Sequence, residues 1–168
     1  MLLAVLVVVV VPAAAAAAPS GFRETSRLQP IASAVSPGAI VYCSRSEDLW
    51  RTDVSERFPG APSWSRVGAY YVGSEVFLSP FACRALEGWL RGKNVPTLQY
   101  LAVYSLTLVH ELMHARGIVS ERAADCAALK VLPGVLRTYL HVRNAVTLRR
   151  VVRLAWADNA AKPAEYRC

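Results

Sequence analysis

Histidine is scarce in this chain, and its cysteines stand far apart. Only three of the 168 residues are histidine, and none of the four cysteines belongs to a C-x-x-C pair. The missing pairs argue against a thiolate zinc site or a redox dithiol. The sequence also has no internal repeat, and its length suits one modest domain. A metal site in this chain would therefore need histidine or carboxylate ligands.

Long apolar runs are missing beyond the first 18 residues, which raise the apolar share of the chain to 54%. The stretch 1–11 is unbroken and leads through Pro12 into six alanines. Such a run is typical of a secretory signal peptide, and it is shorter than the roughly 20 residues that a transmembrane helix needs. No Lys or Arg precedes it, which departs from the usual pattern. We expect residues 1–18 to be a signal peptide, with an uncleaved membrane anchor as the alternative.

Two of the three histidines lie in one motif, His110-Glu111-Leu112-Met113-His114. Histidines four residues apart on a helix lie one turn apart on the same face, so both rings can reach one metal ion, most often zinc. Glu111 follows the first of them, where its carboxylate can deprotonate a water molecule. The surrounding run 100–113 is largely apolar and helical in character. The alternative is an accidental match on a core helix.

The residues after the motif predict a turn and a second helix. Gly117 is suited to end the first helix, because glycine adopts the left-handed conformation without steric cost. Ser120 is suited to cap the next helix, which puts Glu121 in its first turn. Glu121 can then supply an oxygen as third ligand, and two histidines with one carboxylate are typical of catalytic zinc. Asp125, one turn further, can accept the ring N–H of a ligand histidine.

This pattern resembles the gluzincin metallopeptidases, in which H-E-x-x-H is followed by E-x-x-x-D on the next helix. The short turn between the two motifs is closest to minimal zincins of the ImmA/IrrE type, whose second helix carries E-x-x-A-x-x-x-A; Glu121, Ala124 and Ala128 match it. The resemblance covers residues 75–136. It implies a zinc ion held by His110, His114 and Glu121. It also implies that Glu111 is the general base and that Asp125 accepts a hydrogen bond from a ligand histidine.

A metzincin is the rival assignment, since its motif H-E-x-x-H-x-x-G-x-x-H begins in the same way. The segment from His110 to Gly117 satisfies the first eight positions of that motif. Its third ligand would fall on Ser120, which is a poor zinc ligand, while Glu121 lies one residue out of register. We therefore prefer the gluzincin interpretation.

Export would place the four cysteines in an oxidising compartment, where an even number favours disulfides. Four cysteines allow three connectivities. We expect Cys43 to pair with Cys83, and Cys126 to pair with Cys168, which would tie the C-terminus to the second helix of the site. The alternative is that some of them remain free buried thiols. The leader and the cysteines together predict a secreted, extracellular protein.

The rest of the chain predicts one α+β domain over residues 39–168, after a polar, mobile leader at residues 19–38. A charged, turn-rich region at 44–62 has Trp50 as its anchor. The remaining expected elements are strands and helices in that order: strands 39–43, 67–72 and 75–79, the last two as a hairpin, a helix beginning at Pro80, and helices 98–116, 120–132 and 134–158.

The family resemblance implies a zincin-like fold, with a small N-terminal sheet packed on the active-site helix and two further helices after it. In such folds the edge strand above that helix pairs with the substrate peptide through main-chain hydrogen bonds. Residues 75–79 are our candidate for that edge. The alternative is that they form an ordinary strand of the sheet.

The net charge of +7 comes mainly from arginine, and the densest cluster on the last expected helix is Arg143, Arg149, Arg150 and Arg153. A basic helix face can attract nucleic acid or anionic lipid. Because no aromatic residues interleave with this cluster, we expect a solvated face and no nucleic-acid partner. We also expect a monomer, with membrane contact only through an uncleaved N-terminal segment.

The motif and the leader together predict a secreted, zinc-dependent metallopeptidase that hydrolyses bonds in a peptide or protein substrate. Glu111 would take a proton from a zinc-activated water and return it to the leaving amine. Tyr139 or His141 is a candidate donor to the oxyanion, with ordinary helix surface or core as the alternative. Two other functions stay open: a non-catalytic secreted zinc-binding domain, and a disulfide-stapled interaction domain with an accidental motif.

Overall fold

The computed structural model describes residues 20–59, 67–93, 97–164 and 167–168 of the chain. Within these ranges there is one sheet of four short strands: β1 (Phe22–Glu24), β2 (Ile40–Ser44), β3 (Ala69–Val72) and β4 (Glu75–Leu78). The spatial order is β1-β2-β4-β3, with β2 and β4 parallel and the two outer strands antiparallel to their neighbours. β3 and β4 form the predicted hairpin, and Gly73 turns it with a positive φ of 58°.

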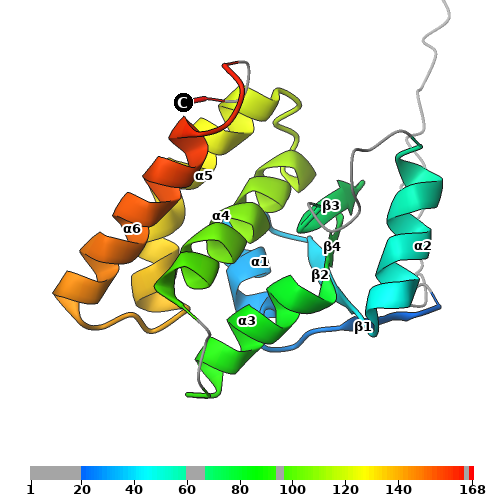
Figure 1. Ribbon diagram of the computed structural model, residues 1–168, viewed down its shortest axis with the longest axis horizontal. Helices are drawn as coiled ribbons and strands as arrows, with labels where there is room; N and C mark the ends of the chain where they lie inside the picture. The colour runs from blue at the N-terminus through cyan, green and yellow to red at the C-terminus, as the bar shows by residue number, and fades with distance from the viewer. Residues whose placement is uncertain (1–19, 60–66, 94–96, 165–166) are drawn as a thin grey trace, which may run out of the picture.

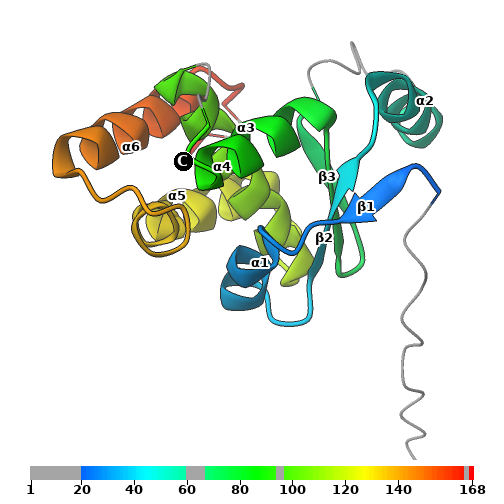
Figure 2. The ribbon, with the colours of Figure 1, turned by 90° about the horizontal axis from the view of Figure 1, so that it is seen from below.

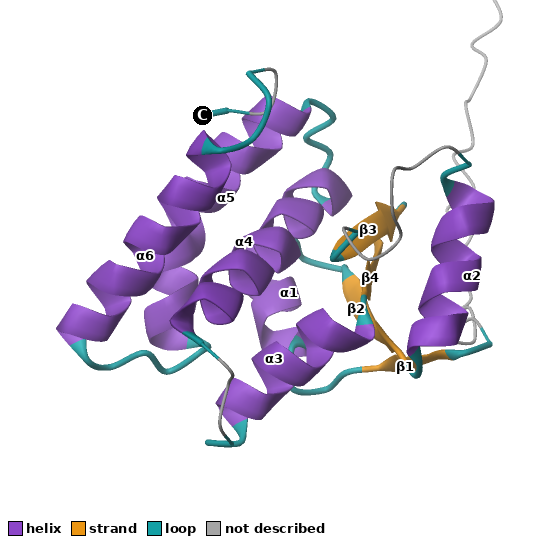
Figure 3. Cartoon of the chain, in the orientation of Figure 1, coloured by secondary structure: helices purple, strands orange, loops and turns teal. Residues whose placement is uncertain are grey.

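Six helices accompany the sheet in the described residues (Figure 3). They are α1 (Gln29–Val35), α2 (Glu47–Arg57), α3 (Pro80–Leu90), α4 (Leu98–Ala115), α5 (Glu121–Thr138) and α6 (Ala145–Ala160). Five of them begin after a side chain that accepts a backbone N–H of the first turn, which are Ser46, Ser79, Thr97, Ser120 and Asn144. Such caps satisfy N–H groups that have no partner inside the helix, so the sequence specifies these starts locally.

Each face of the sheet has its own core, because alternate residues of a strand point to opposite sides. In β2, Val41 and Cys43 belong to the main core and Tyr42 belongs to the second one. The second core is a largely aromatic cluster beneath α2, formed by Phe22, Tyr42, Trp50, Val54, Tyr70 and Phe77. Figures 1 and 2 show α2 alone on that side and the other helices across the sheet, with α4 between the sheet and the α5–α6 pair.

The predicted mobile leader at residues 19–38 is wrong for the part that the structure describes, from residue 20 onwards. This segment forms β1 and α1, and Leu28, Ile31 and Ala32 are buried in the main core. Its prolines suggested irregular structure, but Pro30 lies in the first turn of α1, where its missing N–H costs no helical hydrogen bond. The folded domain therefore begins before β2.

The helix boundaries after the motif also differ from the prediction. α5 continues through Pro133, where a break was expected, and α6 begins well after it. Proline removes one helical hydrogen bond, yet Leu132 and Leu136 are fully buried on either side of it, and this packing keeps the helix continuous. As a result Tyr139 and His141 lie in the connection between α5 and α6 and not on a helix.

Both predicted disulfides are present, and they bear on the compartment of the protein. Cys43–Cys83 joins β2 to α3, and Cys126–Cys168 joins α5 to the C-terminus. Two such bonds are consistent with an extracellular protein. Across the described ranges, the chain forms no helix with the length and apolar character that membrane spanning requires. The expected signal peptide or anchor, residues 1–18, lies outside the described residues.

A buried carboxylate ties the N-terminal strand to α3. Arg23 of β1 donates hydrogen bonds of 3.0 and 2.8 Å to Glu87, and Thr25 donates another of 2.8 Å. Only 5% of the Glu87 side chain is exposed. Burial alone would raise the pKa of Glu87, but the hydrogen bonds from Arg23 and Thr25 outweigh it and hold the pKa below its ordinary value. The charged form of Glu87 therefore stabilises the fold.

Glu87→Gln should remove this charge while it keeps the side-chain volume. We expect the free energy of unfolding near neutral pH to fall by about 2 kcal/mol, because three donors, Arg23, Thr25 and Arg91, lose a charged acceptor. Folding lowers the pKa of Glu87, so its contribution is complete above the ordinary value of 4.5 and is lost as the pH falls through the lower folded-state value. Urea unfolding of wild type and variant should therefore show a difference that shrinks on acidification.

Glu47→Gln is the matched control, since Glu47 pairs with Arg84 of α3 through side chains that are 49% and 60% exposed. An exposed pair contributes little, and we expect a loss below about 0.5 kcal/mol. Equal losses in the two variants, or a Glu87→Gln difference that does not depend on pH, would contradict this account.

Candidate metal centre

α4 presents both histidines of the motif on one face. Thr97 caps the start of the helix by accepting the N–H of Tyr100, and Gly117 follows its end with a φ of 101°. The rings of His110 and His114 lie one turn apart, with centroids separated by 4.6 Å. Both residues are buried, with 8% and 4% of their surface exposed. The motif therefore places two imidazoles together inside the protein, as its spacing predicted.

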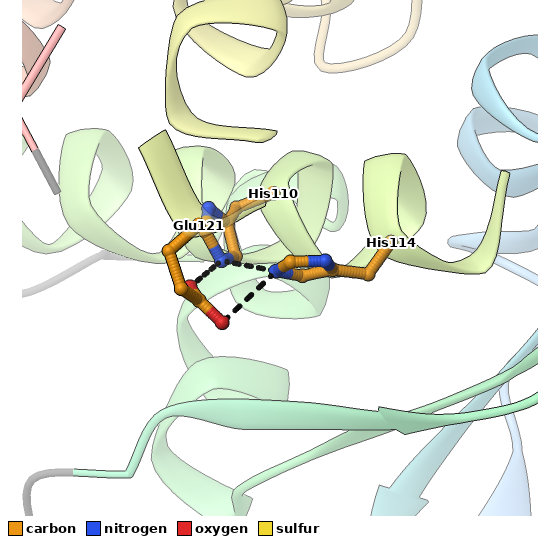
Figure 4. A group of neighbouring side chains, drawn as sticks. All are labelled: His110, His114 and Glu121. Carbon is orange, nitrogen blue, oxygen red and sulfur yellow. Dashed lines mark hydrogen bonds and ion pairs between the residues drawn. The ribbon is translucent and has the colours of Figure 1, made fainter. Parts of the chain in front are cut away.

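α5 brings the third predicted ligand to these histidines. The Ser120 hydroxyl accepts the N–H of Ala123 and is thus occupied as the helix cap. In the first turn, the Glu121 carboxylate oxygens lie 3.0 Å from His110 Nε2 and 3.4 Å from His114 Nε2. The two Nε2 atoms are 3.0 Å apart, and Figure 4 shows all three side chains directed toward one point. Together the three residues form a group that can hold a metal ion.

The hydrogen bonds of the two Nδ1 atoms show which nitrogen of each histidine ring carries the proton. His114 Nδ1 lies 2.6 Å from the carbonyl oxygen of Ile118, which can only accept, so this Nδ1 carries a proton. His110 Nδ1 lies 2.8 Å from the Asp125 carboxylate and donates in the same way. A neutral imidazole has one N–H, so both Nε2 atoms then direct lone pairs toward each other and toward the Glu121 carboxylate. Three acceptors at such distances require a cation among them.

That cation is either an additional proton or a metal ion. Burial lowers the pKa of His110, but the hydrogen bond to Asp125 and the negative charges of Glu111 and Glu121 outweigh it and raise the pKa above its ordinary value. A tetrahedral ion with bonds of about 2.0–2.1 Å keeps its ligand atoms about 3.3 Å apart. The observed separations of 3.0, 3.0 and 3.4 Å are close to that value. The donor set and its spacing therefore fit a metal ion.

Asp125 lies behind His110, in the position that the sequence predicted. It is fully buried and accepts hydrogen bonds from His110 Nδ1, from Asn159 Nδ2 at 3.1 Å and from Lys162 Nζ at 2.8 and 2.9 Å. Burial would raise the pKa of Asp125, but the hydrogen bonds from His110 and Lys162 lower it below its ordinary value. Sequence reasoning missed Asn159 and Lys162, because they lie 34 and 37 residues from Asp125 and no local pattern links them to it.

A cleft of about 530 Å³ opens beside the ligand group, and Glu111 lies in its wall with His110 and Glu121. Burial raises the pKa of Glu111, the charge of His110 lowers it, and the negative charge of Glu121 raises it further. The resulting pKa of Glu111 is about 7. A carboxylate with such a pKa can both take and return a proton near neutral pH. The structure thus places the Glu111 carboxylate in the wall of the cleft, next to His110.

The sheet edge beside this cleft is β3 and not the strand that we expected. Residues 75–78 form β4, which lies between β2 and β3 with partners on both sides, so it cannot pair with a peptide. Alternation of apolar residues does not encode strand order, which depends on the long-range parallel pairing of β4 with β2. Ala69 of β3 lines the cleft, and the Tyr71 ring stacks on His114 with centroids 4.7 Å apart.

Tyr139 and His141, the expected oxyanion donors, are not brought to the cleft. Tyr139 follows the end of α5 and lines a separate hollow with Val35 and Met113. His141 is exposed in the connection before α6, with a φ of 53°. Both were assigned to a helix that was expected to begin at residue 134, and the different boundary moves them away from the site.

No family model, curated protein or solved structure matches the chain.

The centre predicts one tightly bound divalent ion per chain. A bound ion stabilises the native state by about 2.7 kcal/mol when its free concentration is 100 times the dissociation constant. Calorimetric titration of chelator-treated protein with zinc should give a stoichiometry of one, and zinc should raise the melting temperature. Glu121→Gln keeps the side-chain shape but removes the charge, so its affinity should fall by more than about 10-fold.

Glu47→Gln, which alters an exposed carboxylate on α2, should bind zinc as wild type does. Wild-type affinity in Glu121→Gln, or the lack of a stoichiometric ion in the wild-type protein, would contradict the assignment of the centre.

Proposed function

We propose that this protein is a secreted, zinc-dependent metallopeptidase of the gluzincin type. The observation that supports it most is the convergence of His110 Nε2, His114 Nε2 and the Glu121 carboxylate within 3.4 Å of one another. Two histidines and one carboxylate form the ligand set of catalytic zinc sites, which leave a fourth position open, whereas structural sites use four protein ligands. A cleft lined by His110 and Glu121 lies beside the three residues, and a substrate would approach the ion through it.

Zinc held by these residues would supply Lewis-acid chemistry, which polarises a carbonyl group and lowers the pKa of water. The chain itself fixes the ligands and moves the proton. Asp125 and the Ile118 carbonyl each accept an Nδ1–H, so both histidines keep the tautomer whose Nε2 is a ligand. Glu111 would take a proton from the attacking water and deliver it to the leaving amine, a role that its place in the cleft wall beside His110 supports.

An extended peptide is the substrate that the surroundings of the centre favour. β3 is an edge strand beside the cleft, and a peptide can add to such an edge through main-chain hydrogen bonds. The apolar side chains Val67, Ala69, Val103 and Leu106 line the cleft and would contact the side chains of that peptide. Hydrolysis of a peptide bond is therefore the reaction that we propose.

Glu111→Gln should keep the metal and lose hydrolysis. Glutamine has nearly the same volume but cannot accept the proton, so we expect the rate to fall by about 10²–10⁴-fold. The zinc-loaded protein can be incubated with a mixed-sequence peptide library, and new peptide ends can be counted over time by mass spectrometry. Zinc affinity, measured in parallel by calorimetry, should stay close to that of wild type.

Glu56→Gln is the control, because Glu56 is exposed on α2 across the sheet from the cleft. Undiminished hydrolysis by Glu111→Gln would rule out this residue as the general base. A wild-type protein that binds zinc and cleaves no peptide would favour the non-catalytic zinc-binding domain instead.

A further inference from the structure

The C-terminal segment contacts the metal centre at a place that the proposed chemistry does not use. Asn159 lies in the last turn of α6 and Lys162 lies just after that helix, and both donate hydrogen bonds to Asp125. Cys168 is bonded to Cys126, the residue after Asp125. The segment is therefore attached to α5 both by hydrogen bonds to Asp125 and by a covalent bond beside it.

We propose that Lys162 and Asn159 are positioning residues for the ligand His110, and that the Cys126–Cys168 disulfide holds them in place. This inference rests on the metal centre proposed above, but it does not depend on the substrate or on turnover. It adds residues from the end of the chain to a site whose ligands all lie on α4 and α5.

The first step is the partner set of Asp125, which has no exposed surface. A buried carboxylate needs charged or multiple donors, because burial penalises its charged form. Lys162 Nζ bridges the two oxygens, at 2.9 Å from Oδ1 and 2.8 Å from Oδ2, and Asn159 adds a hydrogen bond of 3.1 Å to Oδ2. These donors leave Oδ1 directed at His110 Nδ1, 2.8 Å away. The orientation of the carboxylate, and with it that of the His110 ring, is thereby fixed.

The second step is how the segment itself is held. The backbone N–H of Cys168 donates to Asn159 Oδ1 at 3.0 Å, so the Asn159 amide has its oxygen engaged and its nitrogen directed at Asp125. The disulfide attaches Cys168 to Cys126 on α5. Asp125, Asn159, Cys168 and Cys126 therefore form a closed ring of bonded contacts. Loss of the disulfide opens this ring and frees the segment that carries Lys162.

Lys162→Met tests the first step, because methionine has an unbranched side chain of similar shape but lacks the ammonium group. Zinc affinity should fall by about 10-fold or more, the usual effect of losing a group that orients a ligand. Co²⁺ provides a second readout, because its visible absorption spectrum reports the geometry of its ligands and should change if His110 turns. Lys162→Arg keeps a cation and should recover part of the affinity.

Lys130→Met makes the same change at an exposed position of α5 and should bind both ions as wild type does. If Lys162→Met fails to fold, Asn159→Ala removes a neutral donor to Asp125 together with the acceptor of the Cys168 N–H, and a smaller loss of affinity with an altered Co²⁺ spectrum is expected.

The two disulfides give a matched pair for the second step. They close loops of nearly equal length, with sequence separations of 42 and 40 residues, so removing either should destabilise the fold by a similar amount. Cysteine-to-alanine replacement at 126 and 168 should also weaken zinc binding and change the Co²⁺ spectrum. The same replacement at 43 and 83 should leave both unchanged.

Wild-type affinity and an unchanged spectrum in Lys162→Met, or equal losses of affinity in the two disulfide variants, would overturn the inference. A wild-type protein that binds neither Zn²⁺ nor Co²⁺ would overturn the metal centre as well. A wild-type protein that binds both ions and cleaves no peptide would contradict only the peptidase proposal.

Discussion

Three groups that would repel one another meet between α4 and α5, and much of the fold serves to hold them there. The two Nε2 atoms and the Glu121 carboxylate all offer lone pairs at separations of 3.0 to 3.4 Å. Burial of α4 between the sheet and the α5–α6 pair prevents the histidines from turning away. The turn at Gly117 and the cap at Ser120 then fix where Glu121 arrives. A cation relieves the repulsion, so the folding of these two helices already prepares the centre for a metal ion.

The parts of the centre that lie close together in the chain could be predicted from the sequence. The motif spacing, the glycine after α4 and the serine before α5 are local signals, and they placed both histidines, Glu121 and Asp125 correctly. The strand order, Asn159 and Lys162 could not be predicted, because each depends on packing between segments that are far apart. The first helix was missed for a different reason: Pro30 is typical of a loop but equally suited to a first helical turn.

Two buried carboxylates, Glu87 of α3 and Asp125 of α5, each pair with a cation from a distant segment of the chain. Glu87 is neutralised by Arg23 from the N-terminal strand, and Asp125 by Lys162 from the C-terminal segment. In each case a charge that is costly to bury attaches a terminal segment to a helix of the domain. A disulfide supports each attachment, with Cys43–Cys83 joining the sheet to α3 and Cys126–Cys168 joining the C-terminus to α5. Charge pairing and covalent bonds thus act together between the sheet and α3, and between the C-terminal segment and α5.

The stacking of Tyr71 on His114 connects the outer strand of the sheet to the interior of the metal centre. The two rings lie nearly parallel, at 8°, with centroids 4.7 Å apart. Because the two rings are in direct contact, a shift of β3 would change the packing against the His114 ring. The orientation of the His114 ring therefore depends on where the outer strand of the sheet lies, although the two belong to different layers of the fold.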